Sequence, residues 1–251
     1  MVNTLHYASY TDFITNHPLP QADLDFFTSH PYARPYLNPD NRDNNPYRPV
    51  PFLPRYDKKE DTTDRFFSKV INTPDTVPHL LALMRSPELN PVFAAAKASS
   101  SSHSSWGKTS GAQSAGTAAA AEGAKADPDY ILLAHLATSL SGFRDTVHGG
   151  VLATLLDETL GNCVEGFREG MTFTNAAGGE KPRFYTANLQ VSYRAPVMAP
   201  GVVVIKTWLR GREGRKWFLQ GQVVGEDGVV KVEATSLWIM AREGGGGKSS
   251  L

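Results

Sequence analysis

Cysteine is almost absent from this chain, and neither sign of charge is in excess. One cysteine, Cys163, among 251 residues excludes an intramolecular disulfide and leaves no second thiolate for a cysteine-based zinc site. The 25 Lys and Arg residues balance the 25 Asp and Glu residues, so the formal net charge is zero. We therefore expect a protein of a reducing compartment, with neither nucleic acid nor an anionic membrane as its main partner.

Long apolar runs are also missing. The first twenty residues contain no apolar stretch typical of a signal peptide, and no later segment approaches the roughly 18 apolar residues of a membrane span. The N-terminus carries Asp12 and has no Lys or Arg before Arg34, a poor match to an arginine-rich mitochondrial presequence. The sequence therefore predicts a soluble cytoplasmic protein without a membrane span, and it leaves mitochondrial import open.

Proline is concentrated in one part of the N-terminal region. Residues 31–54 hold seven of the 17 prolines, a density that opposes regular helix and favours extended chain. We predict an irregular Pro-rich arm over residues 1–61, either packed against the rest of the protein or disordered. Residues 62–93 then place apolar side chains at helical spacing, which predicts one or two short helices.

Two segments are poor in the residues that build a core. Ala, Ser and Gly occupy 24 of the 34 positions in residues 94–127, so we expect a disordered insertion there. Residues 243–251 are rich in Gly and predict a flexible tail. The folded domain is therefore expected over residues 128–242.

Residues 128–242 combine one long helical pattern with several strand patterns. Apolar residues recur at spacings of three and four from Leu152 to Phe167, which predicts a long helix with one buried face. Strands are predicted over residues 185–193, 202–210, 216–224 and 229–240. Short connections imply antiparallel neighbours, so this order of elements indicates an α+β domain whose sheet covers the helix.

The start of the predicted helix carries the sharpest chemical pattern. His148, Gly149 and Gly150 stand directly before it, and Asp157 follows nine residues after the histidine. NH groups at a helix N-terminus carry partial positive charge, and glycines let a substrate oxygen approach them. Asp157 falls at the margin of the apolar face, where partial burial would raise the pKa of its carboxyl group and suit a general base. A tight turn and a solvated carboxylate are the structural alternatives.

Four segments occur in order between residues 130 and 241: VHGGVLATLLDETLG, YTANLQVSYRAP, EGRKWF and EATSLWI. Together they resemble the hotdog-fold acyl-CoA thioesterases, of the thioesterase-superfamily-member and phenylacetyl-CoA thioesterase type. The resemblance implies a hotdog fold, in which an antiparallel sheet wraps a long central helix. It also implies a hydrolase of lipid metabolism that converts an acyl-CoA to a free carboxylic acid and CoA.

The same resemblance implies roles for individual residues. Asp157 would be the catalytic carboxylate, as general base for water or as nucleophile. Gly149 and Gly150 would supply the NH groups that polarise the carbonyl, and His148 would have an orienting role at the start of the helix. Thr186 would lie beside the attacking water.

Other residues are candidates for holding the substrate. Thr186 and Asn188 fall on the polar face of their strand, and Arg194, Arg215 and Lys216 at strand ends could attract the phosphates of CoA. Solvent exposure is the alternative for each of them. The histidines show no metal-ligand spacing, so we predict no metal and no cofactor, CoA being part of the substrate. Cys163 lies on the apolar helix face and is expected to be buried and inert.

Helix geometry gives a separate reason to expect two chains at each site. Gly150 and Asp157 are about 10 Å apart along the helix axis, too far for one thioester carbonyl to use both. Antiparallel helices of two chains would bring these residues together, so we predict a homodimer or a dimer of dimers. Two other functions stay open: a hotdog dehydratase acting on acyl thioesters, and a non-enzymatic interaction protein that uses the domain and the Pro-rich arm for docking.

Overall fold

The computed structural model describes residues 7, 9–38, 40, 45–56, 62–100, 127–168 and 183–241. At its centre is an antiparallel seven-stranded sheet with strand order β1-β2-β3-β7-β8-β9-β6. The strands are β1 (Tyr47–Val50), β2 (His79–Arg85), β3 (Tyr130–Leu136), β6 (Phe184–Tyr193), β7 (Gly201–Glu213), β8 (Lys216–Val224) and β9 (Val230–Met240). A separate hairpin consists of β4 (Ser141–Phe143) and β5 (Thr146–Val147).

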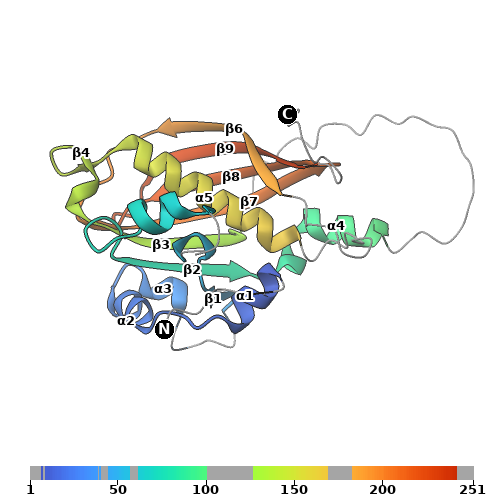
Figure 1. Ribbon diagram of the computed structural model, residues 1–251, viewed down its shortest axis with the longest axis horizontal. Coiled ribbons are helices and arrows are strands. Elements are labelled where there is room, and N and C mark those ends of the chain that lie inside the picture. Colours follow the sequence, from blue (N-terminus) through green and yellow to red (C-terminus); the bar gives the residue numbers. More distant parts are fainter. Residues whose placement is uncertain are drawn as a thin grey trace, which may run out of the picture.

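One long helix, α5 (Gly149–Arg168), lies across one face of the sheet (Figure 1). Its apolar residues are buried against the strands, as the spacing of three and four predicts; Leu155 and Leu156 are fully inaccessible to solvent. The helix approaches the sheet closely at Gly161, where an added Cβ atom would come within 2.8 Å of the Trp238 ring. The predicted α+β hotdog architecture, a sheet wrapped around a long central helix, is confirmed.

The strands that follow α5 form where the sequence predicts them. The predicted segments 202–210, 216–224 and 229–240 correspond to β7, β8 and β9. Their inward side chains alternate along each strand, and Trp217 and Val223 of β8 are completely buried beneath the helix. The prediction of antiparallel neighbours is confirmed for all of these strands.

Helices of the N-terminal region cover the other face of the sheet. Helices α2 (Gln21–Ser29) and α3 (Arg34–Leu37) bury Phe27 and Leu37 against β2, β3 and β7, whereas α1 (Tyr10–Asn16) packs on the side of α5 (Figure 1). The prediction of an irregular arm is therefore wrong for the described part of residues 1–61. Its prolines stand where regular structure tolerates them: Pro35 in the first turn of α3, and Pro49 in the edge strand β1.

A polar and aromatic cluster fixes α2 to the sheet. The buried carboxylate of Asp23 accepts a hydrogen bond from Arg55, and one of its oxygens lies 3.0 Å from Nδ1 of His79. The ring of Phe26 stacks on His79 at 4.1 Å between centroids and on His135 at 5.0 Å. Because His79 and His135 are cross-strand partners on β2 and β3, this helix bridges two strands.

Residues 62–93, predicted to form one or two short helices, also contain a strand of the main sheet. The helical turns within this segment are the π-helix η3 (Phe67–Ile71) and the 3₁₀ turn η4 (Pro87–Leu89), whereas the 3₁₀ turns η2 (Leu53–Arg55) and η5 (Thr138–Leu140) lie outside it. The run from Leu80 to Met84 forms β2. Alternate residues of β2 face α5 on one side and α2 on the other, so the strand is apolar throughout, and its composition resembles that of a buried helix.

The predicted insertion begins later than its composition suggests. Helix α4 (Pro91–Ser100) continues through the first alanines of residues 94–127. Asn90 caps this helix, because its side-chain oxygen accepts hydrogen bonds from the NH groups of Val92 and Phe93. Residues 101–126 and the predicted tail, residues 243–251, lie outside the described part of the chain.

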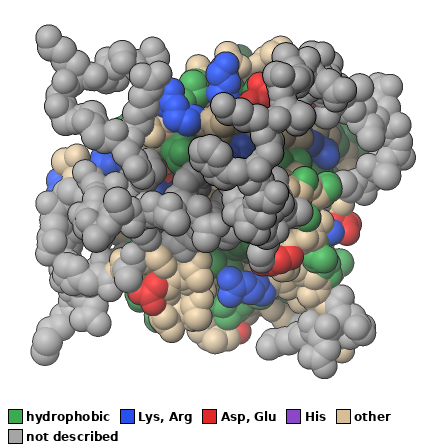
Figure 2. Space-filling view, turned by 90° about the vertical axis from the view of Figure 1, so that its right-hand side faces the viewer, with side chains coloured by type: hydrophobic (Ala, Val, Ile, Leu, Met, Phe, Trp, Pro, Cys, Tyr) green, Lys and Arg blue, Asp and Glu red, His purple; other side chains and the backbone are tan. Residues whose placement is uncertain are grey.

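None of the helices in the described part of the chain has the length and apolar character needed to cross a membrane. Among the described side chains visible in Figure 2, basic, acidic and hydrophobic groups are interspersed.

Candidate active site

His148 caps the start of α5 with its own side chain. The NH group of Gly150 donates a hydrogen bond of 3.0 Å to Nδ1 of His148, while the backbone NH of His148 donates to the carbonyl of Leu140. The imidazole nitrogen therefore accepts the hydrogen bond from an NH group that the sequence analysis expected to bind a substrate oxygen. A carbonyl bound to the NH of Gly150 would have to replace this imidazole nitrogen.

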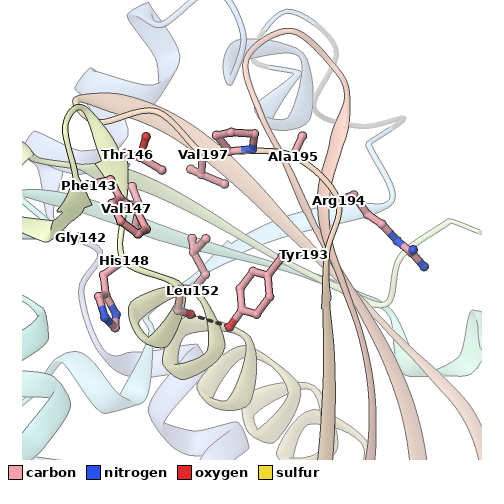
Figure 3. A pocket seen from close by; sticks show the side chains of 12 residues that line it. Gly142, Phe143, Thr146, Val147, His148, Leu152, Tyr193, Arg194, Ala195 and Val197 are labelled. Atoms are coloured by element: carbon pink, nitrogen blue, oxygen red, sulfur yellow. Dashed lines mark hydrogen bonds between the residues drawn. The ribbon is translucent and has the colours of Figure 1, made fainter.

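Tyr193 contacts the same helix start from β6. Its hydroxyl donates a hydrogen bond of 2.8 Å to the carbonyl oxygen of Gly149 (Figure 3). The aromatic ring lies so close that a Cβ atom at position 149 would come within 3.2 Å of it. At position 150, a Cβ atom would lie 3.1 Å from Nδ1 of His148. A larger residue at either position would therefore have to displace the Tyr193 or His148 side chain slightly.

Asp157 lies two turns further along α5 and meets Thr186 of β6. The Thr186 hydroxyl donates a hydrogen bond of 2.9 Å to Oδ1 of Asp157. Burial raises the pKa of the Asp157 carboxyl group, and the hydrogen bond from Thr186 opposes part of that rise. The predicted partial burial of Asp157 is thus present. The carboxylate is a proton acceptor nearer to neutrality than an ordinary aspartate.

A β-bulge in β6 decides which side chains face the helix. Thr186 pairs with Trp238 of β9, but Asn188 pairs with the neighbouring Leu237, so Ala187 is an extra residue. Thr186 therefore shares the helix-facing side with Trp238, while Asn188 is exposed on the opposite side. The prediction that Thr186 and Asn188 share one face is wrong because strict alternation cannot account for the bulge.

The predicted basic residues lie near two different ends of the site. Arg194 directly follows β6, beside the start of α5, and its Nε lies 2.9 Å from the carboxylate of Glu233. Arg215 donates a hydrogen bond of 2.7 Å to the carbonyl of Met240, and Lys216 is exposed next to it. Because Met240 pairs with the first residue of β6, these two cations lie toward the Thr186 end. One chain does not bring the three cations together.

A pocket opens beside the start of α5, and we name it the helix-start pocket. Its volume is about 470 Å³. Its walls come from the β4–β5 hairpin, the first turn of α5, and the end of β6 with the following loop (Figure 3). It is lined by Gly142, Phe143, Thr146, Val147, His148, Gly149, Leu152, Tyr193, Arg194, Ala195, Pro196 and Val197. Sequence reasoning missed Phe143, which stands outside the four family-like segments, and the contact of Tyr193, which lies inside YTANLQVSYRAP but contacts a residue distant in sequence.

The remaining predicted features concern the thiol and metal ions. Cys163 is buried, and burial raises the pKa of its thiol well above the ordinary value, so the thiol is protonated at neutral pH. In the described part of the chain, no three His, Cys, Asp or Glu side chains are grouped so that they could hold a metal ion.

Comparison with known proteins relates the domain to one superfamily. The sequence profile described as thioesterase superfamily matches residues 145–232. The chain is 33% identical over 116 residues to the acyl-coenzyme A thioesterase THEM4 of Rattus norvegicus, covering 46% of this chain and 44% of that protein. It is 29% identical over 106 residues to the uncharacterized mitochondrial membrane protein FMP10 of Saccharomyces cerevisiae, covering 41% and 40%.

The chain was also compared with solved structures. A hypothetical thioesterase protein from Streptococcus pneumoniae, solved with coenzyme A, has a TM-score of 0.39 and 16% identity, covering 47% of this chain and 84% of that one. This chain spans less than half of the length of each of the two relatives named above.

Proposed function

We propose that this chain, whose residues 145–232 belong to the thioesterase superfamily, is an acyl-CoA thioesterase that releases a free carboxylic acid and CoA. The observation that carries the proposal is the half-buried Asp157, hydrogen-bonded by Thr186, on the same helix whose N-terminus carries Gly149 and Gly150. A carboxylate of raised pKa can serve as the general base for thioester hydrolysis, and a helix N-terminus can stabilise the oxyanion that forms.

In the proposed reaction, Asp157 removes a proton from water as the water oxygen attacks the thioester carbon. The negative charge that develops on the carbonyl oxygen is stabilised by NH groups at the start of α5. The tetrahedral intermediate then collapses, the carbon–sulfur bond breaks, and the CoA thiolate takes up the proton held by Asp157. The alternative is direct attack by Asp157, which expels the CoA thiolate and gives a transient anhydride that water then hydrolyses. In ¹⁸O-labelled water, label enters Asp157 when the water attacks the aspartyl carbonyl of the anhydride, whereas the general-base route never labels Asp157.

The open edge of β6 offers a way to complete this site with a second copy of the chain. Within the described sheet, β6 has a neighbour on one side only, β9. A twofold axis at Gln190 would pair Leu189 of one copy with Val191 of the other, both of which pack toward the helix side. Because Ala187 is an extra residue, Thr186 would then lie opposite Tyr193.

This pairing would combine the two separated ends of α5. Tyr193 contacts Gly149, and Thr186 contacts Asp157, so each helix start would face the Asp157 of the other copy. Arg194 of one copy would likewise approach Arg215 and Lys216 of the other, where the three cations could attract the phosphates of CoA. We therefore propose a homodimer with two equivalent composite sites.

Release of free thiol from a panel of acyl-CoA substrates tests the proposed activity. Wild-type protein is expected to release CoA, and the Asp157→Asn variant is expected to lose most of this activity. A flat trace with every acyl-CoA would instead support a non-enzymatic docking protein. Consumption of an enoyl-CoA without thiol release would support a dehydratase.

The cellular location is a proposal of its own. We propose that the protein is cytoplasmic, on the basis of its single cysteine, which is typical of a reducing compartment. The printed name of the yeast relative refers to mitochondria and a membrane, and this concerns that protein. Subcellular fractionation of the C-terminally tagged chain tests the proposal, and co-sedimentation with mitochondria would contradict it.

A further inference from the structure

The helix-start pocket adjoins the proposed reaction centre directly. Gly149 and His148 form part of its wall, and Leu152 of the next helical turn is buried within it. A ligand group in this pocket would therefore be continuous with a thioester carbonyl held at the start of α5. Its volume of about 470 Å³ lies in the range of pockets that bind small organic ligands.

The β4–β5 hairpin forms one side of the pocket and is fixed at its base. The backbone NH of Val147 donates to the carbonyl of Val197 at 2.9 Å, and the NH of Ala199 donates to the carbonyl of Asp145 at 3.1 Å. In contrast, the Phe143 side chain on this hairpin is 83% exposed. A large aromatic side chain beside an open pocket gains apolar contact area when a ligand enters.

The pocket walls suit an apolar group better than a polar one. Buried aliphatic side chains, Val147, Leu152 and Val197, line it. The four polar side chains in the wall already have partners within the protein. Tyr193 donates to the Gly149 carbonyl, and His148 accepts from the Gly150 NH group. Thr146 donates to the Arg144 carbonyl, and Arg194 donates to the carboxylate of Glu233. The amide groups of the pantetheine arm need hydrogen-bond partners, whereas an acyl chain needs only apolar contact.

We propose that the helix-start pocket binds the acyl chain of the substrate and that Phe143 closes over this chain, so that Phe143 sets the preference for chain length. The proposal rests on the proposed acyl-CoA thioesterase function. Each methylene group buried in the pocket should raise kcat/KM by about fourfold until the pocket is full. Removing the Phe143 ring should leave part of the acyl chain exposed to water, so the gain in kcat/KM for each added methylene group should become smaller.

The test measures thiol release from straight-chain acyl-CoA substrates of two to sixteen carbons, for the wild-type protein and for Phe143→Ala. We expect the wild-type kcat/KM to rise steeply with chain length and then level off, and Phe143→Ala to flatten the rise with little change for the shortest substrate. The matched control is Phe66→Ala, because Phe66 is also an exposed aromatic residue, at 57%, and does not line the pocket. This control should keep the wild-type profile.

A second variant probes the interior of the pocket. Ala195 lines the wall opposite the hairpin (Figure 3), and Ala195→Leu should fill space and move the optimum to shorter chains. An equal loss for all chain lengths in Phe143→Ala would overturn the proposal and assign Phe143 to the CoA portion that all the substrates share. A wild-type kcat/KM that does not change with acyl-chain length would also overturn the proposal. Absence of hydrolysis with every substrate would instead refute the proposed function itself.

Discussion

The hydroxyl of Thr186 donates a hydrogen bond of 2.9 Å to Oδ1 of Asp157, linking strand β6 to helix α5 across 29 positions of sequence. Two opposing influences meet at this carboxyl group. Burial favours its protonated form, and the hydrogen bond from Thr186 favours its charged form. The result is a carboxylate that is less acidic than an ordinary aspartate and still able to accept a proton from water.

Replacing Asp157 should remove hydrolysis with little change in shape. We expect Asp157→Asn to lower kcat by roughly 10²–10⁴ and to leave KM within a few fold, because proton transfer is lost and the side-chain volume is kept. Steady-state thiol release measures both constants. The neighbouring Glu158→Gln variant is the matched control and should retain activity. If Glu158→Gln were inactive and Asp157→Asn active, the assignment of Asp157 as the catalytic carboxylate would be contradicted.

The same Asp157→Asn variant should be more stable than the wild type at pH 7. Because burial raises the pKa of the folded carboxyl group above its unfolded value, stability falls as the pH rises above the unfolded pKa, and the full cost of the charge is reached once the pH exceeds the folded pKa. Removing the charge should raise Tm by about 2–4 °C for each kcal/mol of relieved cost. Thermal melts at pH 4 and pH 7 measure this effect, and the gain should shrink at the lower pH. An unchanged or lowered Tm at pH 7 would show that the negative charge of Asp157 does not destabilise the folded state.

Thr186 should act on the pH dependence of the reaction. Without its hydrogen bond, the pKa of Asp157 should rise further, so the acidic limb of the kcat/KM profile should move to higher pH in Thr186→Val. Thr186→Ser keeps a hydroxyl donor and should restore a profile close to that of the wild type. If valine and serine gave the same profile, the hydrogen bond would have no part in setting the base.

His135 should make the fold sensitive to mild acid. Burial lowers the pKa of His135, and the nearby His79 and His30 lower it further, while Glu226 opposes them. The folded state therefore prefers the neutral imidazole: stability is complete above the unfolded value near 6.5 and declines as the pH falls toward the folded pKa. Thermal melts from pH 7.5 to pH 5 should show a smaller decline for His135→Asn than for the wild type. Equal declines would assign the acid sensitivity to other groups.

The sequence predicts the helix and the later strands well because their periodicity is local. The apolar spacing of α5 and the alternation along β7, β8 and β9 follow from one face of each element being buried. The position of Asp157 at the margin of the helix face could be derived in the same way. The family resemblance placed Thr186 beside the attacking water, but the hydrogen bond from Thr186 to Asp157 was not predicted, since residues distant in sequence show no contact pattern of their own.

Other features depend on tertiary packing and escape local reasoning. Strand β2 is covered on both faces, so its uniform apolar run carries no period of two. The bulge at Ala187 reverses the facing of side chains within a strand that alternates regularly in sequence. The N-terminal helices form in a proline-rich region because tertiary burial of residues such as Phe27 outweighs weak local propensity.

The central claim is that Asp157 of one chain acts on a thioester held at the helix start of another, and mixed dimers test it most directly. Asp157→Asn and Gly150→Val chains would be co-expressed with different tags and purified through both tags, so that every dimer contains one copy of each. Neither parent homodimer should be active. Each mixed dimer should contain one intact site and show about half of the wild-type activity per dimer. Inactive mixed dimers, verified as folded and dimeric, would contradict the account by showing that both residues must belong to the same chain.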